Sequence, residues 1–324
     1  MPELTPELLV LPLLSIAAGV DLYLTLLFLG AAPTTTWWDQ PLPGALGDLN
    51  SLGVMLLVGM FYLLEFTAER FPTAALVWNA FHAVIRPLSG ALLALLLLDG
   101  QPPLVIATGA LASGALAATA HAARSGSAIM AWLGARETPH PLLVSLVEDV
   151  AVLGMVALVI DQPTWAFFGG LLILAAGAFG SASRIRAFFF AIRLATGRVF
   201  QGLGAARWTD SSDFPEWVRA AFDDDIMAPG GGLRGNGVGA HGLPGAPRFA
   251  HGWVVVRGDS PAFVYRKWRG TTRIDLAGLP ARDVVETGFF RRVDLGPPGD
   301  APACIFFGVN GPSTESLRAE FLFD

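Results

Sequence analysis

Charged residues are scarce in this sequence of 324 residues, and their scarcity decides the class of protein. Asp, Glu, Lys and Arg together make up 15% of the chain, whereas 53% of the residues are hydrophobic. A soluble domain carries about a quarter charged residues. Long apolar runs separate the few charges that are present. The sequence therefore indicates a protein with several membrane-spanning helices.

Cysteine and lysine each occur once. Cys304 alone excludes an internal disulfide framework and a thiolate metal cluster. Lys267 lies outside every apolar run, which excludes a retinal Schiff base in the membrane. We therefore expect no cofactor and no metal ion. The net charge of −6 gives no support for a nucleic acid as a partner.

Six apolar segments approach the ~20 residues that a helix needs to cross hydrocarbon. They are residues 8–31, 52–68, 75–98, 104–124, 142–160 and 164–181. The N-terminus lacks the basic region of a secretory signal, so we expect no cleaved peptide. Because six spans divide into three plus three, the two halves would have opposite orientations. A 3+3 inverted repeat, as in secondary transporters, is a further hypothesis.

The connections between these segments differ in charge. On one side they carry acids without Lys or Arg, namely Asp39, Asp48, Asp99 and Asp161. On the other side they carry Arg70, Arg124, Arg136, Arg184, Arg186, Arg193 and Arg198. Basic loops stay in the cytoplasm, so both termini are predicted to be cytoplasmic in a bacterial inner membrane. Residues 184–198 are either an interfacial helix or an extension of the sixth span.

The sequence divides into three regions. Residues 1–198 are the predicted transmembrane domain, and residues 199–247 a short helix from Asp213 followed by a Gly/Pro-rich linker. Residues 248–324 contain predicted strands at 253–257, 262–267, 271–276, 284–293, 304–309 and 317–323. The predicted fold is thus an all-α polytopic membrane bundle with a small, independently folded antiparallel β-rich domain in the cytoplasm.

Eight polar side chains fall inside or beside the apolar segments. They are Asp21, Glu65, Asn79, His82, Arg86, His121, Glu148 and Asp149. Ionisable groups in hydrocarbon are costly, so these residues are candidates for a transport pathway or a buried polar core, each with a partner. Most of them gather in the predicted cytoplasmic half of the bundle.

Asp21 and Arg86 are the most specific pair within this set. The rise of a helix places both residues about 16–20 Å from the cytoplasmic face. They carry opposite charges, so we expect them to meet. The contact is either a structural ion pair that fixes helix register or part of a functional site. Asn79, His82 and Arg86 share one helix face, because Asn79 lies three positions before His82 and His82 lies four positions before Arg86.

Several other residues have alternative interpretations. Glu148 is either a buried group or the end of a capping box for a helix that starts at Ser145. Arg124 and the Glu69–Arg70 pair are interpreted as interfacial charges rather than pathway groups. His82 is either functional or a hydrogen-bonded core histidine.

Four segments resemble a known family. They are Leu14-Ser-Ile-Ala-Ala-Gly19 with Tyr23-Leu-Thr25, Leu64-Glu-Phe-Thr-Ala-Glu-Arg-Phe-Pro72, His82-Ala-Val-Ile-Arg-Pro87, and Pro141-Leu-Leu-Val-Ser-Leu-Val-Glu-Asp149. The pattern is similar to a bacterial family of multispan membrane proteins catalogued as a domain of unknown function. The likeness covers residues 8–195, and it departs from the family at Glu69-Arg70, where the family has Asp-Lys. The resemblance implies a membrane domain and no particular activity.

Two functional hypotheses follow. The first is a transporter or channel for a small solute or ion, whose mixed Asp, Glu, His and Arg side chains relay protons. The second is a membrane-anchored binding or assembly protein, whose β-domain recruits a protein or membrane lipid. An enzyme is the weakest interpretation. The Gly-x-Ser-x-Gly elbow, the P-loop and the zinc-protease spacing are all missing, and the run 223–225 lacks calcium-loop spacing.

Overall fold

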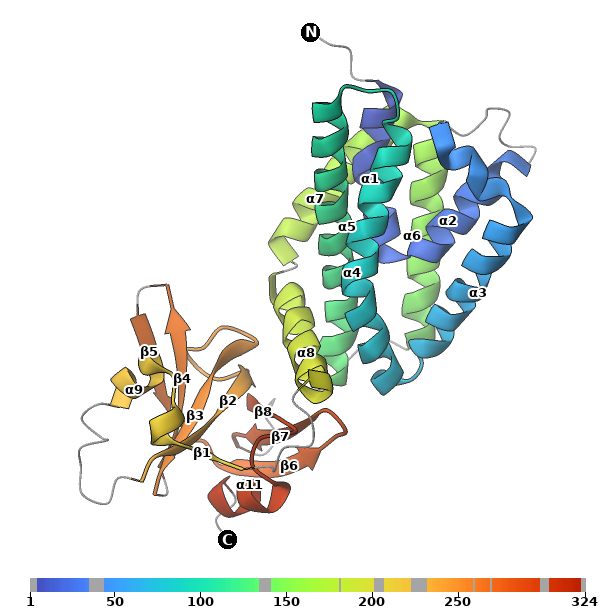
Figure 1. The fold of residues 1–324 in the computed structure, drawn as a ribbon. Coiled ribbons are helices and arrows are strands. Elements are labelled where there is room, and N and C mark those ends of the chain that lie inside the picture. The colour runs from blue at the N-terminus through green and yellow to red at the C-terminus, as the bar shows by residue number, and fades with distance from the viewer. Residues whose placement is uncertain are drawn as a thin grey trace. The chain divides into compact units, whose positions relative to one another are not determined.

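The computed structural model describes residues 5–34, 44–133, 141–180, 182–200, 207–222, 232–258, 260–268, 270–297 and 303–321. The chain forms two compact units, Met1–Phe188 and Phe189–Asp324 (Figure 1). The first unit is helical, and the second is built on an antiparallel sheet. The predicted combination of a helical region and a C-terminal β-domain is confirmed.

The helices of the first unit follow one another without strands among the described residues. They are α1 (Pro6–Val20), α2 (Leu22–Ala31), η1 (Ala32–Thr34), η2 (Gly44–Asn50), α3 (Leu52–Ala68), α4 (Pro72–Leu97), α5 (Pro103–Trp132), α6 (Pro141–Asp161), α7 (Pro163–Gly180) and α8 (Ala182–Phe200), the last of which contains the boundary between the units. Five of these helices begin with proline. Proline suits the first helical position because its missing N–H would have no intrahelical partner there.

Three helical segments are long and apolar enough to cross a membrane, namely Ala74–Leu97, Pro103–Met130 and Leu143–Asp161. A fourth is added if the bent pair α7 and α8 forms one broken span. Three further apolar helices, Pro6–Val20, Leu22–Thr34 and Leu52–Ala68, are shorter. Many large apolar side chains on these helices are exposed, among them Leu104, Leu111 and Leu172. Such apolar surface is consistent with insertion into a membrane.

The predicted first span, residues 8–31, is not one continuous helix. α1 ends at Val20 and α2 begins at Leu22, and Asp21 between them has the extended angles φ −143° and ψ 101°. Apolar periodicity gave no sign of this break. Residues 184–198, which follow the predicted sixth span, belong to a separate helix, α8, that begins at Ala182.

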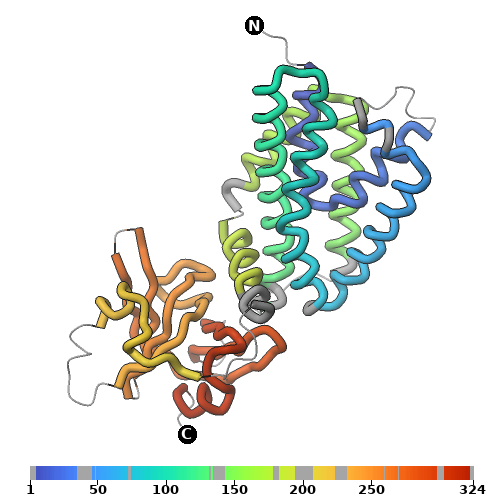
Figure 2. Tube along the Cα trace, viewed as in Figure 1, coloured from blue at the N-terminus to red at the C-terminus, as the bar shows by residue number. Residues whose placement is uncertain are grey.

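Close approach of backbones joins α5 to its neighbours. A Cβ atom at Gly19 of α1 would lie 2.4 Å from the carbonyl oxygen of Ala117 on α5. A Cβ atom at Gly114 of α5 would lie 2.9 Å from the carbonyl oxygen of Pro87 on α4. α4 and α5 run side by side (Figure 2). Small residues allow such contacts between membrane helices.

The second unit is an antiparallel sheet with the strand order β5-β4-β3-β2-β8-β7-β6, to which β1 is added beside β2. Its elements are β1 (Thr209–Asp210), η3 (Ser211–Asp213), α9 (Glu216–Arg219), η4 (Ala220–Phe222), β2 (Arg234–His241), β3 (Ala250–Arg257), β4 (Ser260–Lys267), β5 (Gly270–Asp275), β6 (Ala281–Glu286), β7 (Phe290–Leu295), β8 (Ala303–Gly308) and α11 (Thr314–Phe321). Buried Phe263, Ile305 and Phe307 belong to its main core.

The predicted Gly/Pro-rich linker is wrong where it covers β2, which pairs with both β3 and β8. Gly235, Gly237 and Gly239 alternate along this strand, and aromatic rings occupy the space beside them. A Cβ atom at Gly235 would lie 2.9 Å from the ring of Phe214, and one at Gly239 only 2.0 Å from the ring of Phe190. The glycines thus make room for aromatic packing, and their period of two was the signal of a strand.

Three other local predictions need correction. Residues 317–321 are not a strand but part of α11, where Ser313 Oγ accepts a hydrogen bond from the backbone N–H of Ser316 and thereby caps the helix; residues 322 and 323 of the predicted strand lie outside the described residues. The predicted strand 284–293 is the hairpin of β6 and β7. The helix predicted from Asp213 is a single α-turn flanked by 3-10 turns up to Phe222.

Candidate functional site: a buried charge cluster at a broken helix

The break between α1 and α2 is stabilised by two charged side chains. Asp21 Oδ1 accepts a hydrogen bond from the backbone N–H of Leu24 at 2.9 Å, so Asp21 caps the start of α2. Arg86 of α4 donates from Nη1 to the carbonyl oxygens of Gly19 and Val20, the last two residues of α1. The two residues therefore satisfy opposite ends of the same break, where helix termini leave backbone groups without partners.

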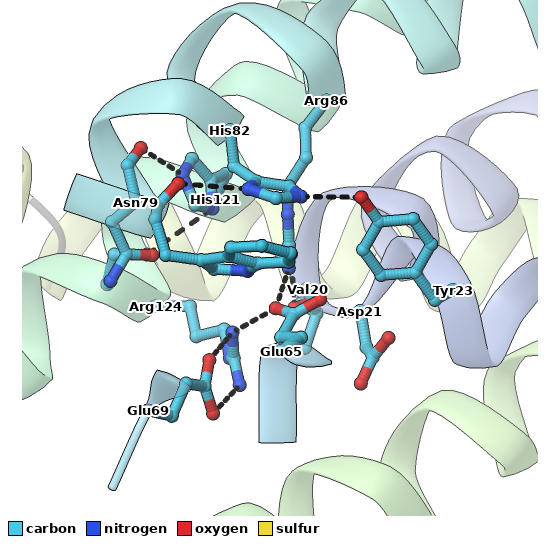
Figure 3. A network of polar contacts seen from close by, with 12 residues as sticks. Val20, Asp21, Tyr23, Glu65, Glu69, Asn79, His82, Arg86, His121 and Arg124 are labelled. Carbon is cyan, nitrogen blue, oxygen red and sulfur yellow. Dashed lines mark hydrogen bonds and ion pairs between the residues drawn. The ribbon is translucent and has the colours of Figure 1, made fainter. Parts of the chain in front are cut away.

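The predicted direct contact between Asp21 and Arg86 is wrong, because Arg86 has another carboxylate as its partner. Arg86 Nη2 instead donates to Glu65 Oε1 of α3, and both side chains are buried (Figure 3). The depth estimate placed Asp21 and Arg86 near each other, and that neighbourhood is correct. It did not give the rotation of each helix, which decides which carboxylate faces the guanidinium.

Arg124 of α5 extends the ion pair into a cluster. Its Nη1 lies 3.3 Å from Glu65 Oε1 and 2.7 Å from Glu69 Oε1, and its Nε lies 2.8 Å from Glu148 Oε2. The cluster draws on α3, α5 and α6, and Glu65 connects it to Arg86 of α4. Only 10% of the Arg124 side chain is exposed. The prediction that Arg124 is an interfacial charge therefore missed these contacts with carboxylates.

Glu148 reaches Arg124 from the middle of its helix rather than from a cap. α6 begins at Pro141, so Ser145 lies inside the helix and cannot be its N-cap. The capping-box interpretation is therefore wrong. Asp149, the next residue along, accepts a hydrogen bond at Oδ2 from the Tyr62 hydroxyl of α3 at 3.0 Å.

Two atoms of the cluster remain without a hydrogen-bond partner among the described residues. They are Glu65 Oε2 and Arg86 Nε, and both are buried. Buried polar atoms are paired in the great majority of cases, so an unpaired carboxylate oxygen is uncommon. Glu65 thus offers one oxygen that can accept a proton or bind a cation.

A second, uncharged chain of hydrogen bonds lies beside the cluster. His82 Nδ1 lies 2.9 Å from the carbonyl oxygen of Trp78, and His82 Nε2 lies 2.8 Å from the Tyr23 hydroxyl. A carbonyl oxygen only accepts, so Nδ1 carries the proton and Nε2 accepts from Tyr23. The ring of His82 lies 6.4 Å from that of His121.

A separate group of hydrogen bonds centres on His121 of α5. Its Nε2 lies 3.3 Å from the Asn79 carbonyl oxygen, and its Nδ1 lies 3.3 Å from Ser125 Oγ. Ser125 Oγ donates to Asn79 Oδ1 at 2.8 Å. Ser125 lies one helical turn after His121, a spacing that the sequence displays and that the sequence reasoning missed.

Of the eight residues proposed from the sequence, Glu65, Arg86 and Glu148 belong to the charge cluster, Asp21 lies at the adjoining helix break, Asn79, His82 and His121 form the uncharged hydrogen bonds, and Asp149 follows Glu148 and bonds Tyr62. Sequence reasoning missed Tyr23, Tyr62 and Ser125, which supply hydroxyls, and it left Glu69 outside the site. Within the described residues, no group of three or more His, Cys, Asp or Glu side chains is placed to hold a metal ion. The arrangement is suited to holding and exchanging protons or small cations, because its acceptors outnumber its two guanidiniums.

Comparison with known proteins agrees with the family likeness seen in the sequence. No curated protein matches the chain. Residues 8–182, more than half of the chain, match a family of unknown function, and they include all eight proposed residues. The chain therefore belongs to the family described as Domain of unknown function (DUF4126).

Proposed function

We propose that the helical unit is a transporter or channel for a small solute or ion in the bacterial inner membrane. In this proposal α1 and α2 act together as one broken span, α3 and α7 also cross, and both termini face the cytoplasm. Three helical segments are long and apolar enough to cross a membrane, and they support such a topology together with the acidic and basic connections between apolar segments. An inverted 3+3 arrangement stays part of this proposal.

One observation carries the proposal above all others: a broken helix meets a buried charge cluster inside the unit. Discontinuous helices supply exposed backbone groups at the substrate and ion sites of many transporters. Here the end of α1 and the start of α2 lie beside Glu65 and Arg86. A bundle that served only as an anchor would have no need for such a costly arrangement.

The charges favour a proton or a cation as the transported species. Glu65, Glu69 and Glu148 pair with only Arg86 and Arg124 in the described cluster, and Asp21 adds a fourth carboxylate at the adjoining helix break. When ionised, the four carboxylates exceed the two guanidiniums, and a cation or proton would balance the surplus. The His82–Tyr23 and His121–Ser125 contacts offer groups that both donate and accept protons.

The test is cation and proton flux in liposomes that contain the purified full-length chain. Asp21→Asn is the informative variant, because asparagine caps a helix as well as aspartate but carries no charge. We expect flux from the unaltered protein and a large loss of flux in Asp21→Asn, with an unchanged melting temperature. Glu7→Gln, which changes a half-buried acid at the start of α1 outside the charge cluster, is the matched control. Flux no greater than that of empty liposomes would refute the proposal.

A further inference from the structure

The hairpin between β4 and β5 presents a tryptophan to solvent. Trp268 follows the last residue of β4, and 98% of its surface is exposed, more than that of any other large apolar residue among the exposed ones described. Most tryptophans bury their large ring, and exposed ones are enriched where proteins meet a partner or the membrane–water interface. The exposed indole is therefore available to contact a partner or a membrane surface.

Positive charge surrounds the ring. Arg266 and Lys267 immediately precede Trp268, and both are exposed. Lys267 Nζ lies 5.4 Å from the centre of the Tyr265 ring. The stretch from residue 242 to residue 274 contains six basic residues and one acid, whereas the whole chain has a net charge of −6. The hairpin is therefore a basic region of an acidic protein.

The base of the hairpin is firmly held. Tyr265 pairs with Gly252 on β3 and with Thr272 on β5, so β4 is bonded on both sides close to its end. The buried Tyr265 side chain also donates from its hydroxyl to the carbonyl oxygen of Gly245 at 2.6 Å. The loop that contains Gly245 leads to the exposed Arg248. The tip of the hairpin therefore extends from a strand end that is hydrogen-bonded on both sides.

We propose that this tip, defined as Arg266, Lys267 and Trp268, binds the headgroup region of an anionic phospholipid bilayer. The indole would lie among the headgroups, and the two bases would contact phosphates. Tryptophan favours this layer because its ring is apolar and its N–H is polar, while basic side chains are attracted to anionic leaflets. The tip is charged oppositely to such a surface, and this complementarity selects lipid over an apolar protein groove.

A weak attraction between the tip and lipid is sufficient for binding, because the rest of the chain already holds the second unit near a membrane. The apolar helices of the first unit keep the second unit tethered near a bilayer, so the tip meets the surface at high effective concentration. Three side chains would bind a free protein only weakly to lipid, but a tethered unit needs no more. The proposal concerns the β-sheet unit alone and does not depend on transport.

The experiment uses the full chain in nanodiscs, with Cys304→Ala as background and an NBD fluorophore on Thr271→Cys. Thr271 is exposed on β5 beside the tip and pairs with Arg266, so the label leaves Trp268 in place. A label on Gly288→Cys, where a Cβ atom meets nothing within 4 Å, is the matched control in the β6–β7 hairpin. Lipids with a nitroxide on the headgroup quench the label on contact.

We expect quenching at position 271 to exceed that at position 288 by about twofold or more in phosphatidylcholine discs containing phosphatidylglycerol. The difference should shrink in pure phosphatidylcholine, and in Trp268→Ser and the double charge reversal Arg266→Glu/Lys267→Glu. Equal quenching at the two positions in anionic discs would overturn the proposal. So would shielding of the label at position 271 in detergent without lipid, because that result would indicate a protein surface over the tip.

Discussion

Arg86 pairs with Glu65 and at the same time donates hydrogen bonds to the last carbonyl oxygens of α1. One guanidinium therefore connects α4 to α3 and stabilises the break in front of Asp21. Its side chain is 0% exposed, so none of these contacts can be replaced by bulk water. The stability of the helical unit depends on this residue through backbone and carboxylate partners together.

A double-mutant cycle tests this pairing. Glu65→Gln and Arg86→Gln should each lower the free energy of unfolding by ~3–5 kcal/mol, because each leaves a buried charge without its partner. The double variant should lose less than the sum of the two. Denaturation in detergent, followed by circular dichroism, measures the coupling. The cycle of Asp21→Asn with Arg86→Gln is the control and should be closer to additive; strictly additive effects for Glu65 and Arg86 would contradict the observed pair.

Glycines at the helix crossings give a second prediction. Gly19→Ala should destabilise the helical unit by about 1–3 kcal/mol, because the new methyl group would collide with the Ala117 backbone. Gly154→Ala in the middle of α6 should be neutral or slightly stabilising, since a Cβ atom there meets nothing within 4 Å. Melting temperatures of both variants in the same detergent make the comparison. Equal losses would show that α1 and α5 do not approach as closely as described.

The topology is tested by labelling with a membrane-impermeant maleimide. In a Cys304→Ala background, Asp99→Cys should react in intact cells, because its loop has no Lys or Arg and is predicted to be periplasmic. Asp213→Cys should react only after the membrane is permeabilised. Both residues are exposed in the structure, so access is set by the membrane. Asp39 and Arg136, which give further test positions, lie outside the described residues; reversal of the pattern would refute the predicted orientation.

The β-sheet unit should require its N-terminal strands. Residues 248–324, which the sequence analysis predicted to fold alone, lack β2, although β2 joins β3 to β8. A fragment of residues 189–324 should show β-type circular dichroism and a cooperative melt, whereas residues 248–324 should not. The longer fragment also retains Phe190, whose ring lies 5.3 Å from that of Phe306. Cooperative melting of the short fragment would show that β2 is dispensable.

Acid should weaken the same unit. Partial burial and the positive charge of Arg248 lower the pKa of His241 below its usual value of 6.5. The unfolded chain then binds the proton more readily than the folded chain, so stability is complete above about pH 6.5 and decreases as the pH falls through the lowered pKa. The urea midpoint should therefore fall on acidification, and His241→Gln should reduce this dependence.

Cys304 supplies the measurement, because it pairs with His241 across the sheet. Burial and the nearby Asp294 raise the pKa of its thiol to about 12, so the folded thiol should react slowly. Unfolding exposes it to a dipyridyl disulfide, which reacts over the whole pH range required. A urea midpoint that stays constant between neutral and mildly acidic pH would contradict the role of His241.

The sequence determined the properties that depend on composition and local order. The shortage of charge and the apolar runs indicated membrane insertion, and the turn sequences located most strands from β3 to β8. The polar residues in apolar segments identified Glu65, Arg86 and Glu148 of the charge cluster in advance, whereas Arg124 and Glu69 were interpreted as interfacial charges. These inferences succeed because apolar burial and turn chemistry act within a few residues of the chain.

Only the tertiary structure decided which of these residues meet. The partner of Arg86 depends on the rotation of α3 and α4 about their axes, which depth does not give. The break at Asp21 is tolerated because Arg86, 65 positions further along, satisfies the freed carbonyls. β2 forms because distant rings of Phe190 and Phe214 fill the space beside its glycines. In each case, a partner far along the chain supplies the interaction that the local sequence lacks.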